Sequence, residues 1–344
     1  RPDRNYRLME FCGGHTHVIS RYGLEGILPK NVRMIHGPGC PVCVMPIGRI
    51  DSAIELALEH GVILCTYADT MRVPASKGLS LMKAKAQGGD IRMIYSAADC
   101  LDIARANPDK NVVFFAIGFE TTTPATAVVL KQAKAEGLKN FFVFCNHVLT
   151  PPAMRHILKN QEKVHIEGFV GPAHVSTIIG SEPYETFAKD YSKPVVIAGF
   201  EPLDMLQSIL MLIRQINRGE AEVENEFTRA VRPEGNMKAI RMMEEVFALR
   251  DSFEWRGLGS VPKSALKLSD AYSDFDAEKH FNLVYRSVPD NKACECGAIL
   301  RGEKQPSDCR AFGTVCTPES PIGSCMVSSE GACAAYFTYG RHKR

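Results

Sequence analysis

Residues 111–118, NVVFFAIG, form the stretch that decides the fold. Six apolar side chains follow one another at 112–117, without the alternation of a strand that has one face in water. The run PVVIAG at 194–199 has the same character. Continuous runs of this length are typical of parallel strands that helices cover on both faces, so the sequence predicts an α/β fold.

Eight strands of this kind are predicted, and helical segments separate them. The predicted strands are 6–11, 32–36, 62–67, 91–95, 111–118, 140–145, 167–171 and 194–199. The predicted helices are 47–60, 99–107, 123–136, 151–160, 203–218 and 235–248. Strands and helices that alternate in this order favour parallel sheets, because parallel neighbours are joined through a crossover helix.

A weak internal repeat divides these elements into two sets of four strands. YSAADCL at 95–101 resembles FEPLDML at 200–206, an offset of 105 residues. MEFCGGHT at 9–16 precedes FAIGFETT at 115–122 by a similar distance. We therefore expect a duplicated unit: two similar four-stranded parallel α/β domains at 6–109 and 110–220.

From residue 221 the pattern changes to one helix, long loops and a cysteine-rich tail. Six of the twelve cysteines lie in the last 51 residues, at 294, 296, 309, 316, 325 and 333. A segment that cannot build a large core needs another means of stabilisation. Residues 221–344 are therefore predicted to form a third, loop-rich domain.

Composition and charge exclude several classes of protein. The formal net charge of +2, with no basic run, argues against binding to nucleic acid or to a membrane surface. No apolar run reaches the roughly 18 residues that span a bilayer, and the start has no secretory signal. The cysteine pattern suits a cytoplasmic metal or thiol protein better than a secreted disulfide scaffold. The chain starts without Met and enters a strand at once, so we expect further residues upstream.

The candidate site lies in the loops that follow the first three strands: CGGHTH at 12–17, GPGCPVC at 37–43 and TYADTMR at 66–72. Ligands of parallel sheets bind beyond the carboxyl ends of the strands. One crevice is therefore predicted to contain Cys12, His15, His17, Cys40, Cys43 and Asp69. A helix beginning at Cys12 lowers the pKa of its thiol and favours the thiolate, the form that binds iron. The alternative is that Cys12 and His15 are buried packing residues.

The CPVC segment at 40–43 has the spacing of a redox-active dithiol. Zinc ligation and a structural role are its alternatives. In the tail, four of the six cysteines suffice for an iron–sulfur cluster, and a structural zinc is the rival. The spacing alone does not choose among the six.

Two other motifs favour structural roles. In GFETTTP at 118–124, one of Thr121, Thr122 and Thr123 is expected to cap a helix that has Pro124 in its first turn. The alternative is an anion or nucleotide site at that helix N-terminus, without a P-loop. His147 and His174, at strand ends of the second domain, are expected to be satisfied polar residues rather than ligands.

Six motifs together resemble the HypD family of [NiFe]-hydrogenase maturation factors. They are CGGHTH, GPGCPVC, GFETTTP, GFEPLD, EWRGLG and MVSSEGACAAY, and the resemblance runs from about residue 6 to the tail. It implies two similar α/β domains with a C-terminal iron–sulfur domain. It also implies a scaffold for assembly of the Fe(CN)2CO group. The scaffold acts with the small chaperone HypC, receives cyanide as a thiocyanate from HypE, and reaches the hydrogenase large subunit through HypC.

The resemblance also assigns residues. It implies that Cys12 binds the iron of the Fe(CN)2CO unit and that Cys40 and Cys43 are the thiol pair. The family spacing C-x14-C-x6-C-x16-C selects [4Fe-4S] ligands in the tail: Cys294, Cys309, Cys316 and Cys333.

The remaining tail cysteines, Cys296 and Cys325, resemble the exchangeable pair beside the cluster of ferredoxin–thioredoxin reductase, so a redox relay is expected. His15 is expected to be an iron ligand or proton donor. One rival hypothesis is a stand-alone [4Fe-4S]-dependent disulfide reductase. The other is an ATP-hydrolysing enzyme, in which Thr121 and Thr122 contact the nucleotide. The leading hypothesis is an assembly scaffold with redox chemistry rather than an enzyme with ordinary turnover.

Overall fold

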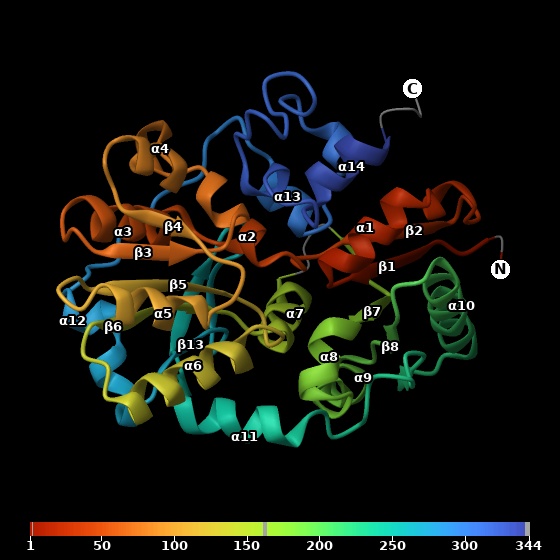
Figure 1. Ribbon diagram of the computed structural model, residues 1–344. Helices are drawn as coiled ribbons and strands as arrows, with labels where there is room; N and C mark the ends of the chain where they lie inside the picture. Colours follow the sequence, from red (N-terminus) through yellow and green to blue (C-terminus); the bar gives the residue numbers. More distant parts are fainter. Residues whose placement is uncertain (2, 161–163, 341–344) are drawn as a thin grey trace. The chain divides into compact units, whose positions relative to one another are not determined.

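Parallel pairing divides the first nine strands into two sheets in the computed structural model, which describes residues 1, 3–160 and 164–340. The chain forms two compact units. Unit 1 consists of Arg1–Cys43, Thr150–Met237 and Lys292–Arg344, and unit 2 of Val44–Leu149 and Lys238–Asn291. In Figure 1 the three segments of unit 1 are red, yellow-green to green, and blue.

Unit 1 is built on a five-stranded parallel sheet of order β2-β1-β7-β8-β9. Its strands are β1 (Tyr6–Glu10), β2 (Val32–His36), β7 (Gly168–Pro172), β8 (Val195–Ala198) and β9 (Val223–Asn225). In register, Met9 of β1 lies between Ile35 of β2 and Phe169 of β7. The carboxyl ends of these three strands therefore meet at one edge of the sheet.

Helices cover both faces of this sheet. Leu8 of β1 packs in one cluster with Ile19 of α1 and Ile209 of α10. Phe169 makes edge contacts with Phe11 and with Phe187 of α9. The helices of unit 1 are α1 (Gly13–Arg21), α7 (Thr150–Lys159), α8 (Ala173–Ile179), α9 (Glu185–Tyr191), α10 (Pro202–Arg218), α13 (Cys296–Leu300) and α14 (Ala332–Gly340).

Unit 2 is built on a four-stranded parallel sheet of order β4-β3-β5-β6. Its central strand β5 carries NVVFFAIG, and every residue of Val112–Gly118 is buried, as expected from the run. The strands are β3 (Ile63–Thr66), β4 (Ile91–Met93), β5 (Val112–Gly118) and β6 (Phe141–His147). Figure 1 shows α3 (Ile47–Leu58) and α4 (Leu81–Ala86) on one side of this sheet, with α5 (Asp99–Ala106) and α6 (Thr123–Glu136) on the other.

A later segment of the chain completes unit 2. Its elements are α11 (Met237–Val246), β10 (Phe247–Leu249), β11 (Ser252–Trp255), β12 (Gly259–Pro262), β13 (Leu266–Leu268) and α12 (Ala277–His280). The strands form two antiparallel pairs, β10 with β13 and β11 with β12. Trp255 is fully buried and donates its indole N–H to the hydroxyl of Ser264 at 2.8 Å. The short helix α2 (Pro41–Val44) begins directly after Cys40 and contains the other three residues of the CPVC segment.

The eight predicted strands and six predicted helices are present, each within two residues of its predicted ends. The parallel α/β class is therefore confirmed. No helix within the described ranges has the length and hydropathy needed to span a bilayer.

The strands, however, do not divide between the two sheets at residue 109. β1 and β2 pair with β7, β8 and β9, whereas β3–β6 pair among themselves. The chain leaves the first sheet after β2 and returns to it at β7. The compact units therefore differ from the contiguous domains predicted at 6–109 and 110–220. Residues 221–344 also divide, because Lys238–Asn291 belongs to unit 2 and Lys292–Arg344 to unit 1.

The GFETTTP loop between β5 and α6 differs in one respect from its predicted capping role. Pro124 lies in the first turn, as expected. Thr122 is at the N-cap position, but its side chain makes no cap hydrogen bond. Its hydroxyl donates instead to the carbonyl of Phe119 at 3.2 Å, and Thr123 donates to the same carbonyl at 3.0 Å.

His147 ends β6 as a buried residue whose predicted satisfaction is met at one ring nitrogen, since Nδ1 has no hydrogen-bond partner among the described residues. Its Nε2 is 2.8 Å from the hydroxyl of Thr126 on α6. Burial lowers the pKa of His147 to about 4. The imidazole is therefore neutral at physiological pH.

We expect this histidine to make unit 2 acid-sensitive. Its pKa is depressed on folding from an ordinary value near 6.5, so the unfolded chain binds the proton more readily. The stability is fully present above pH 6.5 and falls between pH 6.5 and 4, by about 3 kcal/mol at pH 4. Urea unfolding of the wild type and of His147→Asn at pH 7 and pH 4 measures the change in the free energy of unfolding. The variant should lose about 3 kcal/mol less than the wild type between the two pH values. Equal losses in both proteins would contradict the assignment.

Candidate functional site

Cys12 lies where β1 ends and α1 begins, at the carboxyl edge of the sheet in unit 1. It is the N-cap residue of α1, with an extended backbone at φ −142° and ψ 125°. The Gly13 N–H donates to the carbonyl of Gly39 at 3.1 Å, so the GPGCPVC loop after β2 lies against this turn. Two of the predicted loops therefore meet, as the parallel order of β1 and β2 requires.

The turn after β7 brings His174 to the same place. Sγ of Cys12 and Nδ1 of His174 are hydrogen-bonded at 3.6 Å. The ring of Phe200, which follows β8, stacks on His174 with 3.9 Å between centroids and lies 5.0 Å from His15. Gly14 permits this arrangement, because a Cβ there would lie 2.7 Å from the Phe200 ring.

His15 is completely buried on α1, and its side chain is hydrogen-bonded to the backbone at the end of β8. Its Nε2–H donates to the carbonyl of Ala198 at 2.9 Å, while Nδ1 has no partner in the described residues. Burial lowers the pKa of His15, so the ring is neutral. A neutral imidazole with an unused ring nitrogen is a chemically suitable metal ligand.

Glu10 is a further residue of this site, and the sequence analysis missed it. It is the last residue of β1 and is fully buried. Its carboxylate accepts the N–H of Cys12 at 2.8 Å and hydrogen bonds from Thr16 and His36. The sequence feature that could have indicated it is a carboxylate inside the otherwise apolar run LMEF at 8–11.

The expected pKa of Cys12 is wrong in direction. Burial raises the pKa of its thiol to about 12. The backbone N–H of Gly14 at the helix N-terminus does lower it, but by less, and the charges of Glu330 and Glu10 raise it further. The thiol is therefore protonated in the metal-free chain, and a metal that binds Cys12 must displace that proton.

The CPVC dithiol is buried and contacts the tail. The Cys43 N–H is 3.3 Å from Sγ of Cys40, and the thiol of Cys43 is hydrogen-bonded to those of both Cys40 and Cys325. The hydroxyl of Ser324 donates to the Cys43 carbonyl at 2.8 Å, which fixes the tail against this loop. Burial raises the pKa of Cys43.

The thiol contacts continue from Cys325 into the tail. Hydrogen bonds from Cys296, Cys333 and Cys43 lower the pKa of Cys325. Hydrogen bonds with Cys296 and Cys325 raise the pKa of Cys333. Cys296 and Cys325, the predicted relay pair, are therefore in contact, and both are free thiols.

Two of the predicted cluster cysteines, Cys294 and Cys316, lie beside Gly323 and its neighbour Ile322. A Cβ on Gly323 would collide with Sγ of Cys294 and lie 2.6 Å from Sγ of Cys296. The Ile322 N–H donates to Sγ of Cys316 at 3.4 Å. Cys309 is half-buried and interacts with Glu295.

The donor type suits an iron–sulfur cluster, because such clusters are held by soft cysteine thiolates. Each ligand of such a cluster binds a different iron. In the described part of the chain, no three His, Cys, Asp or Glu side chains are grouped so as to hold one metal ion.

Known proteins are similar in sequence to this chain over nearly its full length. The family model described as "HypD: Hydrogenase formation hypA family" matches residues 1–340. The chain belongs to the HypD family. It is 66% identical to the hydrogenase maturation factor HypD of Cupriavidus necator, over 100% of this chain and 92% of that protein. It is 47% identical to HypD of Escherichia coli K12, over 98% of this chain and 90% of that protein.

Several predicted residues do not join the Cys12 site of this HypD family member. His17 packs edge-on against Tyr339, where α1 contacts α14 in unit 1. Asp69, Thr121, Thr122 and His147 belong to unit 2.

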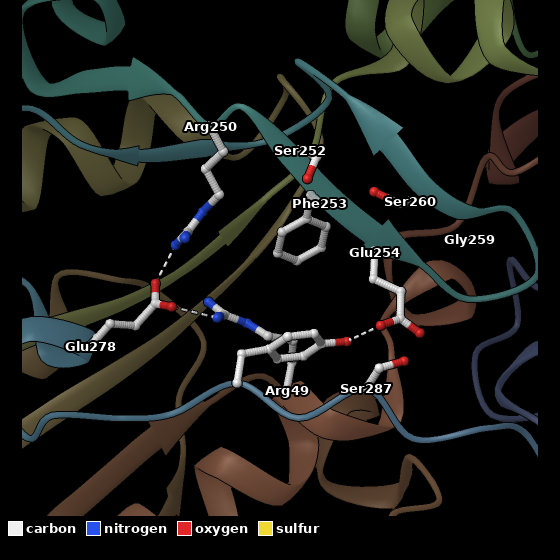
Figure 2. Close-up of a pocket in the computed structure, with 10 residues that line it drawn as sticks. Arg49, Arg250, Ser252, Phe253, Glu254, Gly259, Ser260, Glu278 and Ser287 are labelled. Carbon is white, nitrogen blue, oxygen red and sulfur yellow. Dashed lines mark hydrogen bonds and ion pairs between the residues drawn. The ribbon is translucent and has the colours of Figure 1, made fainter.

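Unit 2 also has a pocket of about 500 Å³ that no predicted site residue lines. Figure 2 shows Arg49 and Arg250 of this pocket directed at Glu278, whose pKa they lower to about 2 although burial alone would raise it.

Contact between Cys43 and Cys325 predicts a trappable disulfide. Mild oxidation with diamide should yield peptides that link Cys43 to Cys40 or to Cys325, because both thiols contact Cys43. Gly331→Ala should reduce the Cys43–Cys325 share. Its Cβ would run into the Cys325 carbonyl and lie 3.0 Å from Sγ of Cys43. Peptide mapping measures the two shares.

Gly340→Ala, at the end of the helix α14 that follows Gly331, is the matched control, since its nearest neighbour is the flexible ring of Tyr336 at 3.3 Å. Finding no Cys43–Cys325 link in the wild type would contradict the contact.

Proposed function

We propose that this chain is the scaffold on which the Fe(CN)2CO group of [NiFe] hydrogenases is assembled, and that its thiols supply the reducing equivalents. Family membership supports the maturation role, since the relatives are named hydrogenase maturation factors. The arrangement of Cys12 and the cysteine contacts supports the finer assignment.

The iron is the cargo of this scaffold, and Cys12 is its proposed ligand. A thiolate is a soft donor that suits a low-valent iron carrying cyanide and CO. Nδ1 of His174, 3.6 Å from Sγ, is placed to take the proton that the metal displaces. Nδ1 of His15 is the second candidate donor, since it is buried and has no partner among the described residues.

The proposed cyanide step is a two-electron reduction of a protein thiocyanate by the Cys40–Cys43 dithiol. The S–CN bond breaks, the partner's sulfur leaves as a thiol, and cyanide leaves as HCN or as a ligand plus a proton. The two thiols lose two electrons and form one disulfide. Atoms and charge balance as RSCN + 2 Cys–SH → RSH + Cys–S–S–Cys + HCN.

Thiol exchange then regenerates the dithiol. Cys325 contacts Cys43, so its thiolate can attack the Cys43 sulfur and release Cys40 as a thiolate. Cys296 contacts Cys325, so it can resolve the mixed disulfide and release Cys43. The oxidising equivalents then lie in a Cys296–Cys325 disulfide.

Cys294, Cys309, Cys316 and Cys333 are the proposed ligands of a resident [4Fe-4S] cluster. Such a cluster supplies single electrons when bound, which is the chemistry needed to reduce a neighbouring disulfide. Cys333 contacts both Cys296 and Cys325. The ligand set therefore adjoins the relay pair.

The single observation that carries the proposal is the continuity of sulfur contacts from Cys40 through Cys43 and Cys325 to Cys296 and Cys333. All five residues belong to unit 1, which also contains Cys12.

The same continuity supports the second candidate, a stand-alone disulfide reductase. That function gives no role to Cys12, His174 and the buried Glu10. Retention of disulfide reduction with no dependence of iron loading on Cys12 would favour it.

The proposed partners are a HypC-type chaperone, which shares the iron and leads to the hydrogenase large subunit, and a HypE-type protein that brings the thiocyanate. The proposed location is the cytoplasm, without nucleic acid or membrane. Binding of ATP at Thr121 and Thr122 stays a prediction. The Thr122 hydroxyl is already hydrogen-bonded to the Phe119 carbonyl, so the side chain gives that site no support.

The cluster assignment predicts the effect of single Cys→Ser changes. Replacing Cys294, Cys309, Cys316 or Cys333 should abolish the brown chromophore of anaerobically purified protein and destabilise residues 292–344. Absorption spectroscopy with iron and sulfide analysis measures the first effect, and limited proteolysis the second. Cys100→Ser, a buried cysteine of unit 2, is the control that should keep the chromophore. Protein that carries zinc and neither iron nor sulfide would overturn the assignment.

The iron assignment predicts the effect of Cys12→Ala. The variant should co-purify with the chaperone without infrared bands of Fe–CN and Fe–CO, while its [4Fe-4S] spectrum is unchanged. The cost in stability should be roughly 1 kcal/mol, because one small side chain is removed. Infrared spectroscopy of the complex is the measurement. Wild-type band intensity in the variant would show that Cys12 is not the ligand.

A further inference from the structure

Glu10 carries a carboxylate at a buried position where an apolar residue would be expected. It ends β1, its chain neighbours Met9 and Phe11 are buried in the core, and the Glu10 side chain has no exposed surface. A buried carboxylate is costly unless it is paired and hydrogen-bonded. The structure supplies both kinds of compensation.

Three donors converge on its two oxygen atoms. Oε2 accepts the Cys12 N–H at 2.8 Å, and a backbone N–H can only donate. Oε1 accepts from the Thr16 hydroxyl and from Nδ1 of His36, the latter at 2.9 Å with His36 also buried. The Cys12 N–H contact fixes Oε2 of Glu10 as an acceptor, which is the role of a carboxylate oxygen.

The contact with Cys12 has a geometric consequence. The Cys12 N–H precedes the helix and has no partner within it, so Glu10 takes the place of a helical carbonyl. This fixes the extended backbone of Cys12, whose Sγ then meets Nδ1 of His174.

The contact also has an electrostatic consequence. A negative charge two residues from Sγ, in a buried site, attracts a cation bound to that sulfur. A second carboxylate acts in the same sense: a Cβ on Gly13 would lie 2.5 Å from Cβ and 2.8 Å from Oε2 of Glu330.

We propose that Glu10 is the positioning residue of the iron site: by accepting the Cys12 N–H it orients Cys12, and so fixes the place of the sulfur that binds the metal. This inference rests on the proposed role of Cys12 as iron ligand. It assigns the residue that orients Cys12, which that role leaves open.

The test is a titration of the anaerobically purified full chain with Co²⁺. The Cys12-dependent signal is the thiolate-to-cobalt charge-transfer absorption that remains after subtraction of the same titration of Cys12→Ser. Glu10→Gln should weaken this binding by roughly 10- to 100-fold, the usual cost of removing a residue that orients a ligand. It removes the charge but keeps the size of the side chain.

Thr16→Val is the matched control. It removes one hydrogen bond to Glu10, as the glutamine does, but leaves the charge and the Cys12 contact in place. It should leave the Cys12-dependent affinity unchanged. A purely structural role of the network would weaken binding equally in both variants, and that result would overturn the proposal.

The remaining outcomes separate this inference from the proposed function. Cobalt binding that depends on Cys12 but is the same in Glu10→Gln overturns the inference alone. Absence of any Cys12-dependent signal in the wild type overturns the role of Cys12 itself. If Glu10→Gln does not fold, Glu10→Asp replaces it. Aspartate keeps the carboxylate, but its shorter side chain withdraws it from the Cys12 N–H. The Cys12-dependent affinity of Glu10→Asp for Co²⁺ must therefore be lower than that of Thr16→Val for the proposal to stand.

Discussion

Pairing of β1 with both β2 and β7 is the constraint on which the chemistry of unit 1 depends. Because the three strands are parallel, Cys12 after β1, Cys40 after β2 and His174 after β7 emerge at the same edge. A slip of one residue in this register would turn Glu10 to the other face of the sheet. The backbone hydrogen bonds of three short strands therefore determine which side chains meet, before any side-chain contact is made.

The cysteine tail completes that edge without a sheet of its own. It is held by the Ser324–Cys43 hydrogen bond and by packing of α14 on α1, which Figure 1 shows beside each other. Cys325 belongs to the same short turn as Ser324, so the bond that fixes the tail also places a tail thiol against Cys43. Structural anchoring and sulfur contact are thus achieved by adjacent residues.

The sequence predicted the elements well because each is a local pattern. NVVFFAIG and PVVIAG became buried parallel strands, and CGGHTH and GPGCPVC were correctly placed at neighbouring strand ends. The pairing of strands is not a local property, so the 105-residue repeat could not reveal that β1 and β2 join β7 rather than β3. His174 and Glu10 were missed or undervalued for the same reason, since their meaning comes from partners that pairing supplies. The pKa of Cys12 was misjudged because burial, which sequence does not report, outweighs the helix N-terminus.

Unit 1 is assembled from the beginning, the middle and the end of the chain, and this has a consequence for synthesis on the ribosome. Domains generally fold as units while the chain emerges from its N-terminal side. The segment Val44–Leu149 appears before β1 has met β7, and Lys238–Asn291 before the tail is made. Cys12 therefore leaves the ribosome hundreds of residues before Cys325 and Cys333, its companions in the finished unit. The complete set of thiols therefore exists only after translation has passed Cys333, so the sulfur contacts of unit 1 form after the rest of the chain has been made.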